Sequence, residues 1–94
     1  MRFVRFVWTD EQLEHIARHG VIAAEIEEVC QNKPLVLRTK SKGKNPAYEV
    51  LGQTMSRRYL FCLVIEFPDG GCYPITARTM TSTEVQRYKR WKSR

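Results

Sequence analysis

The segment RYLFCLVIEFPDGGCYPITAR, residues 58–78, decides the fold. Nearly every residue from Arg58 to Phe67 is aromatic or branched, which predicts a strand at the centre of a sheet. The turn Pro68–Gly71 then predicts a hairpin onto a second strand, Tyr73–Arg78. Pro74 cannot donate a ladder hydrogen bond, so it predicts an unpaired position at an edge or a bulge.

The register of this hairpin determines where two arginines point. If Phe67 pairs with Cys72 across the turn, then Phe61 pairs with Arg78, and Arg58 and Arg78 project from opposite faces of the sheet. A one-residue shift, or a bulge near the turn, places both arginines on the same face. A catalytic site shared by the two arginines requires the shifted register.

The remaining elements follow from the periodicity of the apolar residues on either side of the hairpin. Capping boxes at Thr9 with Gln12 and at Thr81 with Glu84 open two helices, and Gly20 is a left-handed stop for the first. The order is β-α-α-β-β-β-β-α, which predicts one small α+β domain over residues 1–94, a mainly antiparallel sheet with helices packed on it. In chain order the predicted elements outside the hairpin are a strand over Arg2–Trp8, helices over Asp10–His19 and around Ala23–Cys30, strands over Leu35–Thr39 and Ala47–Gln53, and a helix from Thr81 through Trp91.

Charge is distributed unevenly along the chain. The 94 residues carry a formal net charge of +6. Residues 1–28 hold three basic and six acidic side chains, whereas the rest of the chain holds thirteen basic and four acidic ones. This asymmetry favours a basic surface for a polyanion, with nucleic acid as the leading partner class.

Several classes of protein are disfavoured by the sequence. No apolar run approaches the roughly 20 residues that span a bilayer, and no secretory or transit signal is readable, so we expect a cytoplasmic protein. The three cysteines lack Cys-x-x-Cys spacing, which favours buried free thiols over disulfides or zinc. His15 and His19 have i, i+4 spacing, but Ile16 stands where a zinc hydrolase places its glutamate, so neither metal nor cofactor is expected.

Seven short motifs are spread over nearly the whole chain. They are Phe6-Val7-Trp8, Arg18-His19-Gly20-Val21, Glu27-Glu28-Val29, Gly52-Gln53-Thr54, Arg58-Tyr59-Leu60-Phe61, Ile75-Thr76-Ala77-Arg78, and Glu84 with Tyr88. In order and spacing the chain resembles the BrnT family of bacterial toxins, which are ribonucleases with a RelE-like fold.

The resemblance implies a small cytoplasmic ribonuclease of a type II toxin–antitoxin system, which inhibits translation by metal-independent RNA cleavage. It also implies a cognate antitoxin, often of the ribbon-helix-helix type, through which such pairs contact their operator DNA. The chain departs from the family over Lys33–Tyr48, where members commonly carry an acidic, aspartate-bearing stretch and this sequence is rich in lysine. We expect substrate contacts and partner choice to differ accordingly.

Arg58 and Arg78 are the candidates for binding the scissile phosphate. RNA cleavage without a metal needs fixed positive charge around the phosphorane, and a guanidinium binds phosphate oxygens bidentately while staying protonated. Each arginine sits at the end of a predicted strand, where a sheet would hold it rigidly. The alternative is a structural ion pair, for example with Glu84 or Glu49.

Three further residues are candidates for proton transfer. Glu84 and Tyr88 lie one helical turn apart and share a face, and His19 carries an imidazole, a side chain that can transfer protons. Each also has a simpler explanation. Glu84 completes a capping box, Tyr88 faces the core, and His19 hydrogen-bonds the last carbonyls of its helix.

Basic residues outside the catalytic candidates would supply sequence-independent phosphate affinity. Tyr48, Tyr59, Tyr73 and Trp91 could stack on unpaired bases, although core packing explains most aromatic residues in so short a chain. A noncatalytic RNA- or DNA-binding module with the same fold therefore stays open beside the ribonuclease, as does a plain interaction domain. The RNA-binding candidates are Lys40, Lys42, Lys44, Arg87 and Arg90.

Overall fold

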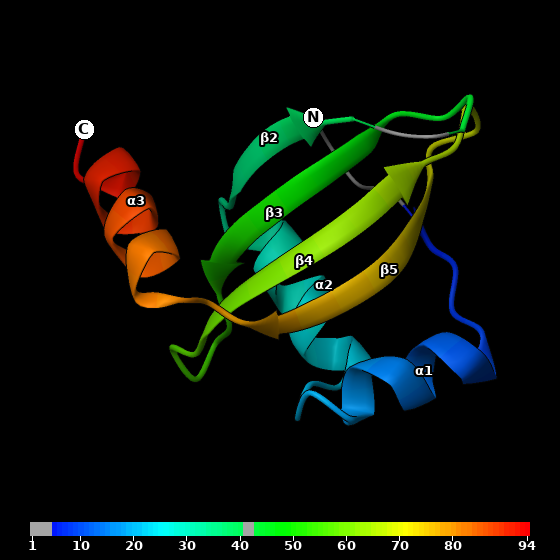
Figure 1. Ribbon diagram of the computed structural model, residues 1–94, viewed down its shortest axis with the longest axis horizontal. Helices are drawn as coiled ribbons and strands as arrows, with labels where there is room; N and C mark the ends of the chain where they lie inside the picture. The colour runs from blue at the N-terminus through cyan, green and yellow to red at the C-terminus, as the bar shows by residue number, and fades with distance from the viewer. Residues whose placement is uncertain (1–4, 41–42) are drawn as a thin grey trace.

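The computed structural model describes residues 5–40 and 43–94 and folds them into a five-stranded sheet with three helices (Figure 1). The predicted α+β class and the predicted order of elements are both confirmed. The elements are β1 Arg5–Phe6, α1 Asp10–Ala17, α2 Ala23–Gln31, β2 Leu35–Thr39, β3 Ala47–Gln53, β4 Tyr59–Glu66, β5 Gly71–Thr79 and α3 Ser82–Lys92.

The strands are arranged in the order β1-β5-β4-β3-β2. The short β1 runs parallel to β5, and the other three pairings are antiparallel, as expected for a mainly antiparallel sheet. The most apolar strand, β4, lies third of the five, so its predicted central position is confirmed. β2 forms one edge of the sheet, next to the basic segment that follows it.

Two predicted elements extend further than the observed ones. The first strand covers only Arg5–Phe6 of the described residues, although Val7 N–H still donates to the carbonyl of Cys72 at 2.8 Å. The first helix ends at Ala17 rather than His19. The left-handed stop at Gly20 is confirmed by its φ of 73°, and the Gly20 N–H donates to Ala17 O at 3.0 Å.

The hairpin contains two register changes that cancel. Glu66, not Phe67, pairs with Cys72, so the predicted pairing beside the turn is wrong. A bulge at Ile75, between the pairs Val64–Pro74 and Leu63–Thr76, then adds one residue to β5. Beyond the bulge, pairing follows the expected register.

The bulge adjoins Pro74, where an unpaired position was expected. The Pro74 carbonyl accepts a hydrogen bond from the side-chain amide of Gln12 in α1, and Gln12 is only 5% exposed. Helix α1 therefore covers part of the stretch of β5 that does not pair with β1. The Gln12 side chain supplies a hydrogen-bond partner where proline interrupts the backbone ladder.

The two faces of the sheet carry separate hydrophobic clusters. Ile16 of α1 and Ile26 and Val29 of α2 pack on alternate β4 residues, including Cys62. On the other face Tyr88 of α3 packs with Leu35 and Leu51, bordered by Phe61. In Figure 1, α2 crosses behind the sheet, α1 lies below β5, and α3 lies to the left, apart from both. None of the helices described is long and apolar enough to cross a membrane.

Candidate nucleic-acid interface

Arg78 is held at the surface in one orientation by Glu84, by Phe61 and by the Thr79 carbonyl, which accepts from its Nη1 at 3.1 Å. It projects from β5 and donates from Nη1 and Nη2 to the two carboxylate oxygens of Glu84, at 2.7 and 3.0 Å. Its guanidinium carbon lies 4.2 Å from the centre of the Phe61 ring. The side chain is nevertheless 39% exposed. The result is an oriented guanidinium, open to solvent on one side.

Glu84 connects this arginine to the start of α3. The predicted capping box is confirmed, because the Thr81 hydroxyl accepts from Glu84 N–H and the Glu84 carboxylate accepts from Thr81 N–H. The Arg78 hydrogen bonds, followed by these cap contacts, hold the pKa of Glu84 below its usual value, and the same pair raises the pKa of Arg78. A carboxylate with a lowered pKa is a poor proton acceptor, so Glu84 is suited to positioning Arg78.

Arg58 has a structural environment. It precedes β4, and its Nη1 donates to Glu25 Oε2 of α2 at 2.6 Å and to the carbonyl of Gly20 at 3.0 Å. These two acceptors lie at the α1–α2 corner, so the arginine ties that corner to the sheet. The turn before it is fixed by Thr54, only 2% exposed, whose hydroxyl accepts from Arg58 N–H at 3.0 Å.

The two arginines do not form one site. Phe61 pairs with Arg78 as expected, and in this register Arg58 lies on the α1–α2 face while Arg78 lies on the α3 face. The shifted register that would bring them together does not occur, because the bulge at Ile75 cancels the shift beside the turn. The expectation that Arg58 and Arg78 bind one phosphate together is therefore wrong, because the two arginines occupy separate positions.

The other two proton-transfer candidates are also separated from each other. Tyr88 is only 1% exposed, and its hydroxyl accepts from Lys92 Nζ at 3.3 Å, so its alternative role as a core aromatic is the observed one. His19 is exposed on the α1 side, with its ring centre 5.3 Å from that of His15. The structure brings together Arg78 and Glu84, while Tyr88 is buried in the cluster with Leu35 and Leu51, and His19 lies on the α1 side next to Gly20, which contacts Arg58.

The basic residues of α3 lie on two sides of the helix. Lys89 lies over the Tyr59 ring at 5.5 Å, and Lys92 lies over the Tyr88 ring at 5.6 Å. On the side toward β2, Arg87 and Arg90 are exposed, as RNA-binding candidates should be. Arg94 continues this side at the end of the chain, and together these three form what we call the arginine row: Arg87, Arg90 and Arg94.

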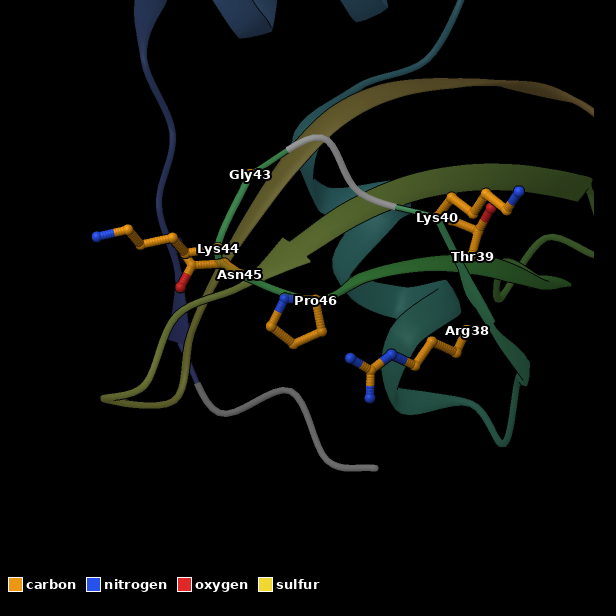
Figure 2. Close-up of a pocket in the computed structure, with 7 residues that line it drawn as sticks. All are labelled: Arg38, Thr39, Lys40, Gly43, Lys44, Asn45 and Pro46. Carbon is orange, nitrogen blue, oxygen red and sulfur yellow. The ribbon is translucent and has the colours of Figure 1, made fainter.

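The predicted lysine loop does not converge on one point. Lys40 and Lys44 line an open hollow at the end of β2, together with Arg38 of that strand. Figure 2 shows that the two lysine side chains point away from each other. Lys42, the third lysine predicted here, lies outside the described residues. The described part of the loop offers dispersed positive charge rather than an assembled phosphate site.

Trp91 was named from the sequence only as one of four aromatic residues that could stack on bases, and it was not among the candidate site residues. It is half-buried, and it lines two hollows of about 360 and 480 Å³. The available signal was its place in the run Arg87-Tyr-Lys-Arg-Trp-Lys-Ser-Arg94, where an aromatic residue stands among cations. Packing against Tyr88, at 6.0 Å between ring centres, explains only part of its surface.

The cysteines are free thiols in the first hydrophobic cluster. Burial raises the pKa of Cys62 and of Cys72 to about 12, and it also raises the pKa of the half-buried Cys30. These thiols are therefore protonated at neutral pH and unsuited to nucleophilic or metal chemistry. Within residues 5–40 and 43–94, no three His, Cys, Asp or Glu side chains are grouped as metal ligands.

No protein-family model and no curated protein matches this chain.

Proposed function

We propose that the protein is a RelE-like ribonuclease toxin of a bacterial type II toxin–antitoxin system, and that it binds and cleaves RNA on the α3 side of its sheet. The observation that carries the proposal is the half-exposed Arg78, oriented by Glu84 and Phe61 at the base of a basic helix. The reaction itself comes from the BrnT resemblance of the sequence.

In this proposal the chain supplies electrostatic stabilisation. The ribose 2′-hydroxyl loses its proton to solvent water as its oxygen attacks the adjacent phosphorus. The bond to the 5′-oxygen breaks, and this oxygen takes a proton from solvent water, so the products are a 2′,3′-cyclic phosphate and a 5′-hydroxyl end. Arg78 binds the phosphoryl oxygens as negative charge develops on them. Glu84 acts as a positioning residue for Arg78, because its lowered pKa makes it a weak base. The mechanism uses neither metal nor cofactor.

The proposal includes a partner. A cognate antitoxin, of the ribbon-helix-helix type, would neutralise the protein in the cytoplasm, and operator DNA would be contacted only through that antitoxin. The α3 side of the molecule, with its exposed arginine row, is charged to attract an acidic segment of such a partner.

A second candidate function is noncatalytic binding of RNA or DNA with the same surface. It is favoured by one observation: of the two proton-transfer candidates beside Arg78, Tyr88 is buried and Glu84 has a lowered pKa. In that case Arg78 and the arginine row would bind phosphates without promoting cleavage.

One experiment separates the two functions. Mixed cellular RNA is incubated in EDTA with the wild type, with Arg78→Ala and with Arg5→Ala, whose arginine forms an exposed pair with Asp69 at the hairpin turn. The toxin proposal expects cleavage to 5′-hydroxyl ends by the wild type and Arg5→Ala, and a loss of roughly a hundredfold or more in Arg78→Ala. Intact RNA at protein concentrations where binding is measurable would favour the noncatalytic module.

A further inference from the structure

Trp91 lines two hollows that are also lined by cations. The smaller hollow, about 360 Å³, is bounded by Lys33 and Lys92, and the larger, about 480 Å³, lies between α3 and the edge strand β2. Trp91 and Arg94 line both of them. The larger hollow is lined by Leu35, Leu37, Arg87, Arg90, Trp91 and Arg94.

The charged side chains around Trp91 have a single sign. The side chains lining the two hollows include five cations and no Asp or Glu. Elsewhere in the described chain, Arg5, Arg58 and Arg78 each form an ion pair with an acidic side chain, whereas Arg18, Arg38 and Arg57 form none. Within residues 5–40 and 43–94, the side chains of the arginine row form no hydrogen bond and no ion pair. Unpaired guanidinium groups gathered around a hollow fit an anionic ligand with several charges.

The aromatic surface between these cations determines the kind of anion. Trp91 is held from below by Tyr88, the buried centre of the second hydrophobic cluster, and its half-buried side chain borders both hollows. Every nucleobase presents a flat π-face to an aromatic side chain, and its flanking phosphates need cations on either side. A single indole bordered by arginines matches this pattern.

We propose that Trp91 is a stacking site for one base of single-stranded RNA, with the phosphates on either side contacting the arginine row and Lys33. This inference rests on the proposed RNA-binding function and adds a second position to it. Trp91 follows Glu84 by seven residues, about 10 Å along the helix. One short oligonucleotide therefore reaches from Arg78, beside Glu84, to Trp91.

The test uses the fluorescence of Trp91 itself. The chain has two tryptophans, and the indole of Trp8 donates to Glu27 of α2, on the other face of the sheet. In Trp8→Phe, Trp91 is the only tryptophan. This variant is titrated with 2′-O-methyl hexauridine, which lacks the 2′-hydroxyl needed for cleavage, and with an abasic hexamer carrying the same phosphates.

We expect hexauridine to quench the Trp91 fluorescence saturably. The abasic hexamer should bind about tenfold more weakly and should leave the Trp91 fluorescence unchanged, because base stacking and phosphate contact are separate contributions. It should also compete with hexauridine for the same site. Trp91→Phe should retain part of the preference for the oligomer with bases, and Trp91→Leu should lose it. The wild-type comparison of hexauridine with the abasic hexamer needs no substitution at Trp91, so a folding defect in a variant cannot decide the result.

Three outcomes overturn the inference in different ways. Equal affinity for the two hexamers without quenching would remove the stacking site and leave RNA binding in place. Failure of both hexamers to bind would remove the proposed RNA-binding function as well. Quenching by polyglutamate without any quenching by hexauridine would assign the hollows to an acidic protein segment alone.

Discussion

Arg58 and Arg78 lie on opposite faces of one sheet, each ion-paired with a glutamate of a different helix. Arg58 joins Glu25 of α2 at 2.6 Å, and Arg78 joins Glu84 of α3 at 2.7 Å. One RNA phosphate cannot contact both guanidinium groups across the sheet. The two arginines of the family resemblance therefore have separate roles, in which Arg58 stabilises the fold and Arg78 faces the proposed RNA surface.

Removal of Arg58 should cost stability rather than RNA affinity. Arg58→Ala leaves Glu25 Oε2 and the Gly20 carbonyl without their donor, while Glu25 Oε1 still accepts from Ile22 N–H. The Glu25 side chain is only 16% exposed, so we expect a loss of about 1–3 kcal/mol in the free energy of unfolding. The measurement is urea denaturation. Arg5→Ala, which breaks an exposed pair, should cost less than about 1 kcal/mol. Equal losses in the two variants would contradict the structural role of Arg58.

The Arg78–Glu84 pair should make stability fall in acid. The pKa of Glu84 in the folded protein lies below its ordinary value of 4.5, because Arg78 hydrogen-bonds its charged form. The stabilisation is therefore present above that value and is lost as the pH falls below it through the lowered pKa. Glu84→Gln keeps the capping box but not the charge. Thermal denaturation from pH 7 to acid should show a steeper loss in the wild type than in Glu84→Gln, by less than about 1 kcal/mol for so exposed a pair.

A pH dependence of equal steepness in both proteins would show that the pair contributes no net stability. The partner variant Arg78→Ala provides the reciprocal check, because it should reduce the acid-dependent loss by less than Glu84→Gln does, since the Thr81 contacts still lower the pKa of Glu84. Asp69 has a lowered pKa as well, owing first to the Gly71 N–H, and its contribution is unchanged in all three proteins.

Local patterns predicted the elements of this fold better than they predicted the site. The caps at Thr9 and Thr81 and the stop at Gly20 are set by neighbouring residues, so the sequence is sufficient to place them. The pairing of Phe61 with Arg78 was correct although the pairing beside the turn was wrong, because the bulge at Ile75 restored the register.

The partners of the arginines could not be identified in the same way. Arg58 finds Glu25 across thirty-three positions of the chain, a contact that depends on how α2 packs on the sheet. Arg78 and Glu84 are only six positions apart, and the sequence suggested an ion pair with Glu84 as one alternative to phosphate binding. The hollows beside Trp91 combine α3 with β2, and no local pattern predicts such a combination.

The cysteines should be unreactive until the protein unfolds. Burial raises the pKa of Cys62 and Cys72 to about 12 and also raises the pKa of Cys30, so almost no thiolate is present at pH 8. A thiol-specific chromogenic reagent should react slowly with the native protein and promptly with three thiols in concentrated urea. Prompt reaction of one thiol in the native state would identify an accessible cysteine and contradict this environment.

Gly52 should not tolerate a side chain. A Cβ atom placed there would lie 3.1 Å from Val29 Cγ1 and 3.3 Å from Pro34 Cβ, at the contact between β3 and α2. Gly52→Ala should therefore lower the free energy of unfolding by about 1–3 kcal/mol in urea denaturation. Gly20→Asn is the control, since nothing lies within 4 Å of its Cβ position and asparagine accepts a positive φ, so its cost should stay below about 1 kcal/mol. A smaller cost at Gly52 than at Gly20 would contradict the close packing.

The salt dependence of RNA binding should locate the phosphate contacts. Each phosphate neutralised on single-stranded RNA contributes about 0.7 to the slope of log affinity against log salt. Arg87→Ala should reduce the slope by about that amount, because Arg87 lines the hollow beside Trp91. Lys44→Ala should leave the slope unchanged. Leu35, at the start of β2, packs against α3, whereas Lys44 lies past the other end of this strand. Fluorescence anisotropy with labelled 2′-O-methyl hexauridine gives both slopes, and a larger change in Lys44→Ala would move the RNA path from α3 to the lysine loop.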